Sequence, residues 1–221
     1  MRSRAQNPVL SVDVVEFDHS ISEGRWKAND RAGERAGHVE PLDCSDACVQ
    51  IAMRLVGELV GGLRFAPFSA LGLAASTFGA YQEPPAPGLS ADRGWVAQEF
   101  PVTGSTRGAI FEFMCSEVMF ACAEAGVPAV ATVFLPKTRG TGIGLGFEDA
   151  RAGRVPVRLL SGERAAGFAM EIKPSQRIAT IRSNRDRTLA ILGRRGVSVE
   201  RMPEILVARL RRVGSTFDCQ Y

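Results

Sequence analysis

The sequence contains no run of about eighteen consecutive apolar residues, the length that a membrane-spanning helix requires, so no membrane span is expected in its 221 residues. Histidine is scarce, with two residues, and the five cysteines do not form two pairs at zinc-ligand spacing. We therefore expect no metal site. The odd number of cysteines and the lack of a secretory signal predict reduced thiols and a cytoplasmic location.

Lysine is also scarce, since it occurs only at Lys27, Lys137 and Lys173, and arginine carries almost all the positive charge. The net charge of +3 is too small to indicate nucleic-acid binding. Arginine suits bidentate binding of carboxylates and phosphates. The hydrophobic fraction of 45% and the charged fraction of 23% are ordinary for a globular protein. The length suits one large domain, or one domain with a helical tail.

The spacing of apolar residues predicts a mixed order of strands and helices. We expect strands at 9–17, 49–55, 58–68, 94–102, 127–135, 153–160 and 165–172, and helices at 108–125 and 203–213. Pro156 places its strand at a sheet edge, because proline cannot donate a hydrogen bond to the ladder. Proline and glycine predict a loop at 81–94. The glycine density of 138–146 likewise predicts a loop or a frayed turn.

The helix at 108–125 joins two successive strands, and such a connection implies a parallel pair in an otherwise antiparallel sheet. We therefore predict a mixed α/β (α+β) fold of the acetyltransferase-like (GNAT) type. In this fold helices flank a central mixed sheet, and the parallel strand pair splays apart to admit a thioester arm. Residues 1–172 would form this domain, and residues 173–221 a helical extension packed on or beside it.

Three stretches follow one another in an order that is typical of a known family. Glu40 and Asp43 lie three residues apart in HVEPLD, VGGLRFAPFS carries Arg64, and GWVAQEFPV carries Trp95. With the helix and hairpin that follow, over roughly residues 38–172, this order resembles the acyl-homoserine lactone synthases, the autoinducer synthases of bacterial quorum sensing. The hairpin that ends in Arg64 is the best anchor of the resemblance.

Members of this family join S-adenosylmethionine to an acyl group that acyl carrier protein or coenzyme A delivers. The amine attacks the thioester, and the methionine carboxylate then displaces methylthioadenosine to close a lactone. The resemblance implies no cofactor beyond these substrates. It implies that Glu40 and Asp43 lie near the positive charges of the substrate. The amine must also lose a proton, and Glu99 is the candidate base if its side chain faces the cleft. Substrate-binding residues would be Arg64, for the carboxylate, and Trp26, Phe100, Val102, Thr132, Phe113 and Val133.

An acyl carrier protein is acidic, so arginines are the expected docking residues. The candidates are Arg151, Arg154, Arg158, Arg164 and the tract 208–212. We expect a monomer or a homodimer.

The chain departs from the family pattern in the stretch at 94–102. The family's glutamate falls on Val96 and its arginine on Glu99. Two alternatives therefore stay open: an N-acyltransferase for another amine or amino acid on the same fold, or a catalytically degenerate protein that binds acyl thioesters. The string GTGIGLG also resembles an ATPase glycine box, but the Asp-x-Gly-x-Gly that should precede it is absent.

Overall fold

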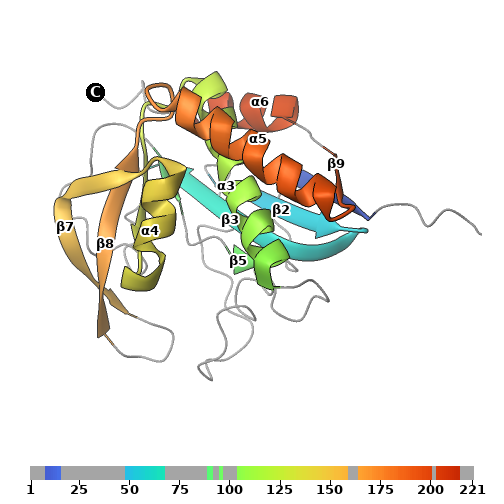
Figure 1. Ribbon diagram of the computed structural model, residues 1–221. Coiled ribbons are helices and arrows are strands. Elements are labelled where there is room, and N and C mark those ends of the chain that lie inside the picture. Colours follow the sequence, from blue (N-terminus) through green and yellow to red (C-terminus); the bar gives the residue numbers. More distant parts are fainter. Residues whose placement is uncertain are drawn as a thin grey trace, which may run out of the picture.

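A computed structural model describes residues 8–15, 48–67, 89–91, 95–96, 104–158, 164–200 and 203–214. Its strands are β1 (Val9–Val15), β2 (Val49–Leu55), β3 (Glu58–Pro67), β4 (Leu89–Ala91), β5 (Trp95–Val96), β6 (Val130–Phe134), β7 (Glu148–Arg158), β8 (Arg164–Ile172) and β9 (Ser198–Glu200). Its helices are α3 (Gly104–Ala125), α4 (Pro136–Leu145), α5 (Ile178–Arg194) and α6 (Pro203–Gly214) (Figure 1). Where the predicted strands and helices fall on described residues, they are confirmed with small shifts at their ends. The loop predicted at 81–94 is wrong at 89–91, which form β4.

The strands form one mixed sheet in the order β7-β8-β6-β4-β3-β2-β1-β9, with β5 beside β3. The pairs β4–β6 and β1–β9 are parallel, and the other strand pairs of the described residues are antiparallel. Helix α3 lies between β5 and β6 in the chain, which is the connection that a parallel pair requires. The predicted mixed sheet of acetyltransferase type is therefore confirmed, as is the edge position of the strand that contains Pro156.

A two-residue turn joins β2 to β3. Val56 and Gly57 both have positive φ angles, of 53° and 82°, as a type I′ hairpin turn requires. The register pairs Gln50 with Arg64 and Ile51 with Leu63. The predicted hairpin is thus confirmed, and its register decides which side chains share a face of the sheet.

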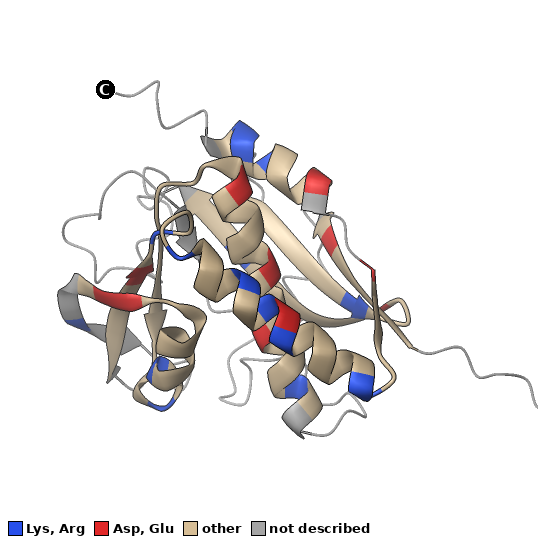
Figure 2. Cartoon of the chain, turned by 45° about the horizontal axis from the view of Figure 1, so that its top comes forward, with Lys and Arg blue, Asp and Glu red and all other residues tan. Residues whose placement is uncertain are grey.

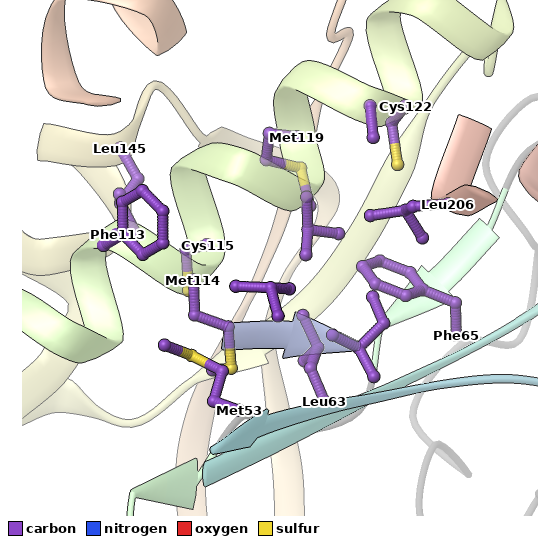
Figure 3. Close-up of a cluster of buried hydrophobic side chains, with 14 of the residues drawn as sticks. Met53, Leu63, Phe65, Phe113, Met114, Cys115, Met119, Cys122, Leu145 and Leu206 are labelled. Atoms are coloured by element: carbon purple, nitrogen blue, oxygen red, sulfur yellow. The ribbon is translucent and has the colours of Figure 1, made fainter. Parts of the chain in front are cut away.

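Helix α3 is covered on more than one side. Its residues Phe113, Met114 and Val118 are fully buried in the main core, together with strand residues such as Phe65 (Figure 3). The side of α3 that carries Glu112 and Ser116 faces α5. There Ser116 is buried, and α3 and α5 pack closely together in Figure 1.

Helix α4 occupies residues that composition assigned to a loop, so that prediction is wrong. Pro136 stands in the first turn, where a missing N–H costs nothing. At the other end Gly146 has a φ of 99°, its N–H donates to the Ile143 carbonyl at 2.9 Å, and the Phe147 N–H donates to the Gly142 carbonyl at 3.0 Å. This is a Schellman cap. Capping and packing against the sheet together outweigh the weak helix propensity of the glycines.

The described part of the C-terminal extension contains the expected helices and one strand that the sequence did not predict. Strand β9 extends the sheet by pairing in parallel with β1, and α6 packs on α3 and contacts β1 and β2. No described helix combines the length and the apolar character needed to cross a membrane.

Candidate functional site

Strand alternation divides the sheet into two faces of different chemistry. On β3, Leu63 and Phe65 are buried in the core, which also contains side chains from α3, α4, α5 and α6. Arg64 lies between them in sequence, so its side chain points to the other face. We call this second face the Arg64 face; on β2 and β3 it carries Gln50, Ala52, Arg64 and Ala66.

Arg64 is 5% exposed, and Gln50, directly opposite it on β2, is 3% exposed. Directly opposed residues in a sheet have Cβ atoms about 5 Å apart, so the two polar groups are neighbours. Their neighbours on this face, Ala52 and Ala66, are small and buried. A buried guanidinium interacts with an anion more strongly than an exposed one, because the local dielectric is lower. The binding of a substrate carboxylate, which the resemblance implies for Arg64, stays a prediction.

A second polar group lies further along the same face. Arg54 Nε is 3.8 Å from Asp13 Oδ2, and Ser11 Oγ donates to the same oxygen at 3.1 Å. These side chains of Arg54 and Asp13 are 29% and 28% exposed. Arg54 therefore has more contact with solvent than Gln50 and Arg64, which are buried.

The residues predicted to bind the acyl group lie on both faces. Thr132, 7% exposed, alternates on β6 with the core residue Val130 and therefore shares the helix-covered face with the fully buried Phe113. Val133 is half-buried and points to the Arg64 face. The structure thus places Thr132 and Phe113 on one face of the sheet, and Arg64 and Val133 on the other.

The remaining predicted residues lie outside the described part of the chain and stay predictions. They are the catalytic candidates Glu40, Asp43 and Glu99 and the substrate-binding candidates Trp26, Phe100 and Val102. One polar residue of the Arg64 face was missed by the sequence reasoning, namely Gln50. The hairpin register around the turn at Gly57 would have placed it opposite Arg64.

The parallel pair is short. In it Leu89 pairs with Val130 and Ser90 pairs with Ala131, whereas β6 continues to Phe134. Among the described residues, the second half of β6 has no β4 partner. If β4 and β6 splay apart as expected for this fold, the gap between them would lie beside the second half of β6 and would connect the two faces of the sheet.

Strand β3 pairs with two short strands in turn. Phe65 pairs with Ala91 of β4, and Gly62 pairs with Trp95 of β5. Both short strands therefore lie against the strand that carries Arg64.

Three phenylalanine side chains, Phe134, Phe147 and Phe168, make aromatic contacts near α4. Phe134 meets Phe147 edge to face, with ring centroids 5.4 Å apart. The guanidinium carbons of Arg139 and Arg154 lie 4.8 and 5.4 Å from the centroid of the Phe168 ring. Arg139 also donates two hydrogen bonds to Asp149, and these hold the pKa of the Asp149 carboxyl below its usual value.

The arginines predicted to dock a carrier protein do not form one surface. Arg154 lies on the edge strand β7, whereas Arg209, Arg211 and Arg212 lie on α6, beside β1 and β2. Figure 2 shows further basic residues along α5 and α6. A small carrier protein could contact only one of these two regions at a time.

The described cysteines are not suited to nucleophilic catalysis. Cys48, Cys115 and Cys122 are buried free thiols. Burial, and to a lesser extent the charge of Glu112, raises the pKa of Cys115 to about 12, and burial also raises the pKa of Cys122. In the described ranges, no three His, Cys, Asp or Glu side chains are grouped so that they could hold a metal ion.

Comparison with known proteins finds similarity in the fold but not in the sequence. No protein-family model matches the chain, and no curated protein is significantly similar in sequence. Among solved structures, the chain is similar to a CoA-dependent acyl-homoserine lactone synthase, BjaI, solved with SAM and isopentyl-CoA. The TM-score is 0.55 and the identity 14%, over 93% of this chain and 99% of BjaI.

Two further solved structures have similar scores. FeeM, an N-acyl amino acid synthase from uncultured soil microbes, has a TM-score of 0.53 at 12% identity, over 85% of this chain and 99% of FeeM. The acyl-homoserine lactone synthase LasI has a TM-score of 0.52 at 16% identity, over 77% of this chain and 94% of LasI. At such identities the likeness establishes a shared fold: the chain has the fold of the acyl-homoserine lactone synthases and of FeeM, as its sequence predicted.

Proposed function

We propose that this protein is an N-acyltransferase of the acyl-homoserine lactone synthase type. It would join S-adenosylmethionine to an acyl group from acyl carrier protein or acyl-CoA and so make a quorum-sensing signal. The observation that carries the proposal is the buried Arg64 at the end of the β2–β3 hairpin, on a fold shared with enzymes of that type. No cofactor besides the two substrates is required.

In this proposal the carboxylate of S-adenosylmethionine binds to Arg64, which orients its amine. Glu40 and Asp43 lie near the ammonium and sulfonium groups, and Glu99 accepts the proton of the amine. The acyl chain lies between Thr132 and Phe113, and the thioester enters beside the short β4–β6 pair. Trp26, Phe100, Val102 and Val133 complete the walls of the site.

The acyl donor and the oligomeric state also belong to this proposal. BjaI was solved with isopentyl-CoA, which makes acyl-CoA the first donor to test. Acyl carrier protein would dock either at the β7–β8 end or at α5 and α6, and the arginines on α5 and α6 are the larger group. The enzyme would act in the cytoplasm as a monomer or homodimer.

A second candidate is supported by the similarity to FeeM, which is an N-acyl amino acid synthase. An amino acid also offers a carboxylate to Arg64 and an amine to the thioester, but it has no sulfonium leaving group. The departures at Val96 and Glu99 support this candidate and also a degenerate protein that only binds acyl thioesters.

The deciding experiment mixes the purified protein with acyl-CoA and acyl-carrier-protein donors of several chain lengths, and with either S-adenosylmethionine or a panel of amino acids. Release of both thiol and methylthioadenosine is expected with S-adenosylmethionine. Thiol release with amino acids alone would favour the FeeM-like activity. Thioester binding without cleavage under any condition would leave the degenerate binder.

The role of Arg64 is tested with Arg64→Met, which keeps much of the side-chain length and removes the charge. The expected result is a rise in KM for the amine substrate of about 100-fold, because a charged hydrogen bond of about 3 kcal/mol is lost. Arg54→Met on the neighbouring strand, whose arginine pairs with Asp13, is the matched control and should leave KM within about twofold. Equal effects of the two changes would argue against a substrate site at Arg64.

A further inference from the structure

A second residue of the Arg64 face has a role that the family resemblance did not supply. Gln50 lies directly opposite Arg64 in the β2–β3 register, and both side chains are at least 95% buried. On the strands that carry them, their same-face neighbours Ala52, Gly62 and Ala66 are small. A substrate group bound by Arg64 would therefore lie within reach of the carboxamide of Gln50. This role of Gln50 rests on the proposed function.

The chemistry of acyl transfer to an amine depends on the charge near that amine. The amine attacks only as the neutral base, and a carboxylate beside it stabilises the ammonium and raises its pKa. A carboxamide oxygen accepts a hydrogen bond from the amine without adding negative charge. The neighbouring guanidinium further disfavours the ammonium, because like charges repel. A neutral acceptor next to a buried cation thus keeps more of the amine in its reactive form at neutral pH.

The geometry points to Gln50 as a positioning residue for the attacking amine, working together with Arg64, which holds the substrate carboxylate. The substrate class is an α-amino acid or a derivative with both groups free, such as S-adenosylmethionine. In the step itself, the amine nitrogen forms a bond to the thioester carbonyl carbon and the carbon–sulfur bond breaks. The proton lost by the nitrogen balances the departing thiolate, which leaves as a thiol.

The test uses two substitutions of similar size and compares complete pH profiles of kcat at saturating amine substrate, from about pH 6 to about pH 9.5, because kcat reports the ionisation of the bound amine. Gln50→Glu adds a carboxylate, so the acid limb of the profile should move up by about one pH unit or more, as expected for an opposite charge within hydrogen-bonding reach of an ammonium. Gln50→Met removes the acceptor without adding charge. It should lower kcat about tenfold and leave the limb in place. Arg54→Gln, on the same strand and face, should change neither quantity.

The position of the acid limb does not depend on how much of the enzyme is folded, so partial misfolding of a variant cannot imitate the expected result. An acid limb that stays fixed in Gln50→Glu while the wild type is active would overturn the role of Gln50 and leave the proposed function standing. The same conclusion follows if Gln50→Met keeps full kcat. If the wild-type protein transfers no acyl group to any amine with a free carboxylate, both the proposed function and this inference are wrong.

Discussion

The three glycines of α4 allow a sharp test of how the helix packs on the sheet. A Cβ atom added at Gly142 would lie 2.8 Å from Cε2 of the Phe134 ring, whereas a Cβ added at Gly140 would meet nothing within 4 Å. Ordinary carbon contacts begin at about 3.5 Å, so Gly142→Ala forces the ring to move. The ring is also held by its edge-to-face contact with Phe147. Gly140→Ala in the same helix is therefore a matched control without a clash.

The magnitudes follow from two opposing effects. Replacing glycine by alanine in a helix interior stabilises it by about 1 kcal/mol, which is the whole effect expected at Gly140. Overpacking a well-filled site costs about 1–3 kcal/mol, so Gly142→Ala should be neutral or destabilising by up to about 2 kcal/mol. The two variants should therefore differ by about 1–3 kcal/mol in the free energy of unfolding. For a chain of this size that is roughly 2–12 °C in melting temperature.

Urea denaturation measures the difference directly, provided that the slope of the transition is the same in both variants. Adding Phe134→Leu should recover most of the loss in Gly142→Ala, because the smaller side chain no longer blocks the new methyl group. The double-mutant cycle then gives a favourable coupling energy. If Gly142→Ala is as stable as Gly140→Ala, the contact between α4 and Phe134 is not as the structure has it.

Three further predictions concern the turn, the thiols and the acid stability. Val56→Asn should raise the free energy of unfolding by about 1 kcal/mol, because asparagine tolerates the left-handed turn conformation that a β-branched residue resists; an unchanged urea midpoint would contradict this. Since burial raises the pKa of Cys115 to about 12, about one thiol in ten thousand is ionised at pH 8, so iodoacetamide should label this residue only after unfolding, as mass spectrometry would reveal. The pKa of Asp149 is lowered by Arg139, so its contribution to stability is present above its unfolded-state pKa and is lost as the pH falls through the lower folded-state value. Asp149→Asn should therefore slightly reduce the melting temperature at pH 7 and have no effect near pH 2, whereas an equal reduction at both pH values would refute the pairing.

The sequence predicted best what depends on short-range pattern. Alternation and the glycine at position 57 were enough to place the β2–β3 hairpin, and the apolar stretch before Pro136 was enough to predict β6 as a strand. The edge position of β7 followed from Pro156 alone. In each case the signal lies within about ten residues, which is the range over which strand and turn preferences act.

What could not be predicted depends on contacts between distant segments. The glycines of α4 argue against a helix when they are considered alone, but Gly142 is what allows the helix to approach Phe134. Glu112 of α3 forms an ion pair with Arg187 of α5 at 2.9 Å, although the two residues lie 75 positions apart in sequence. Strand β9 is three residues long and is defined by its pairing with β1. Local composition contains none of this information.

The division of the predicted site between two faces restricts how the proposed reaction can take place. Arg64 lies on one face of the sheet, and Thr132 and Phe113 lie on the other. A substrate carboxylate at Arg64 and an acyl chain at Thr132 can therefore belong to one reacting complex only where the sheet is open. Leu89 and Ser90 of β4 are paired with Val130 and Ala131 in the first half of β6, so the sheet is continuous there. In the proposed reaction the thioester carbon must therefore lie next to the second half of β6, after Ala131. The proposed function thus requires the second half of β6 to be free of a β4 partner, and bulkier side chains at Val133 should block acyl transfer without weakening the binding of the amine substrate at Arg64.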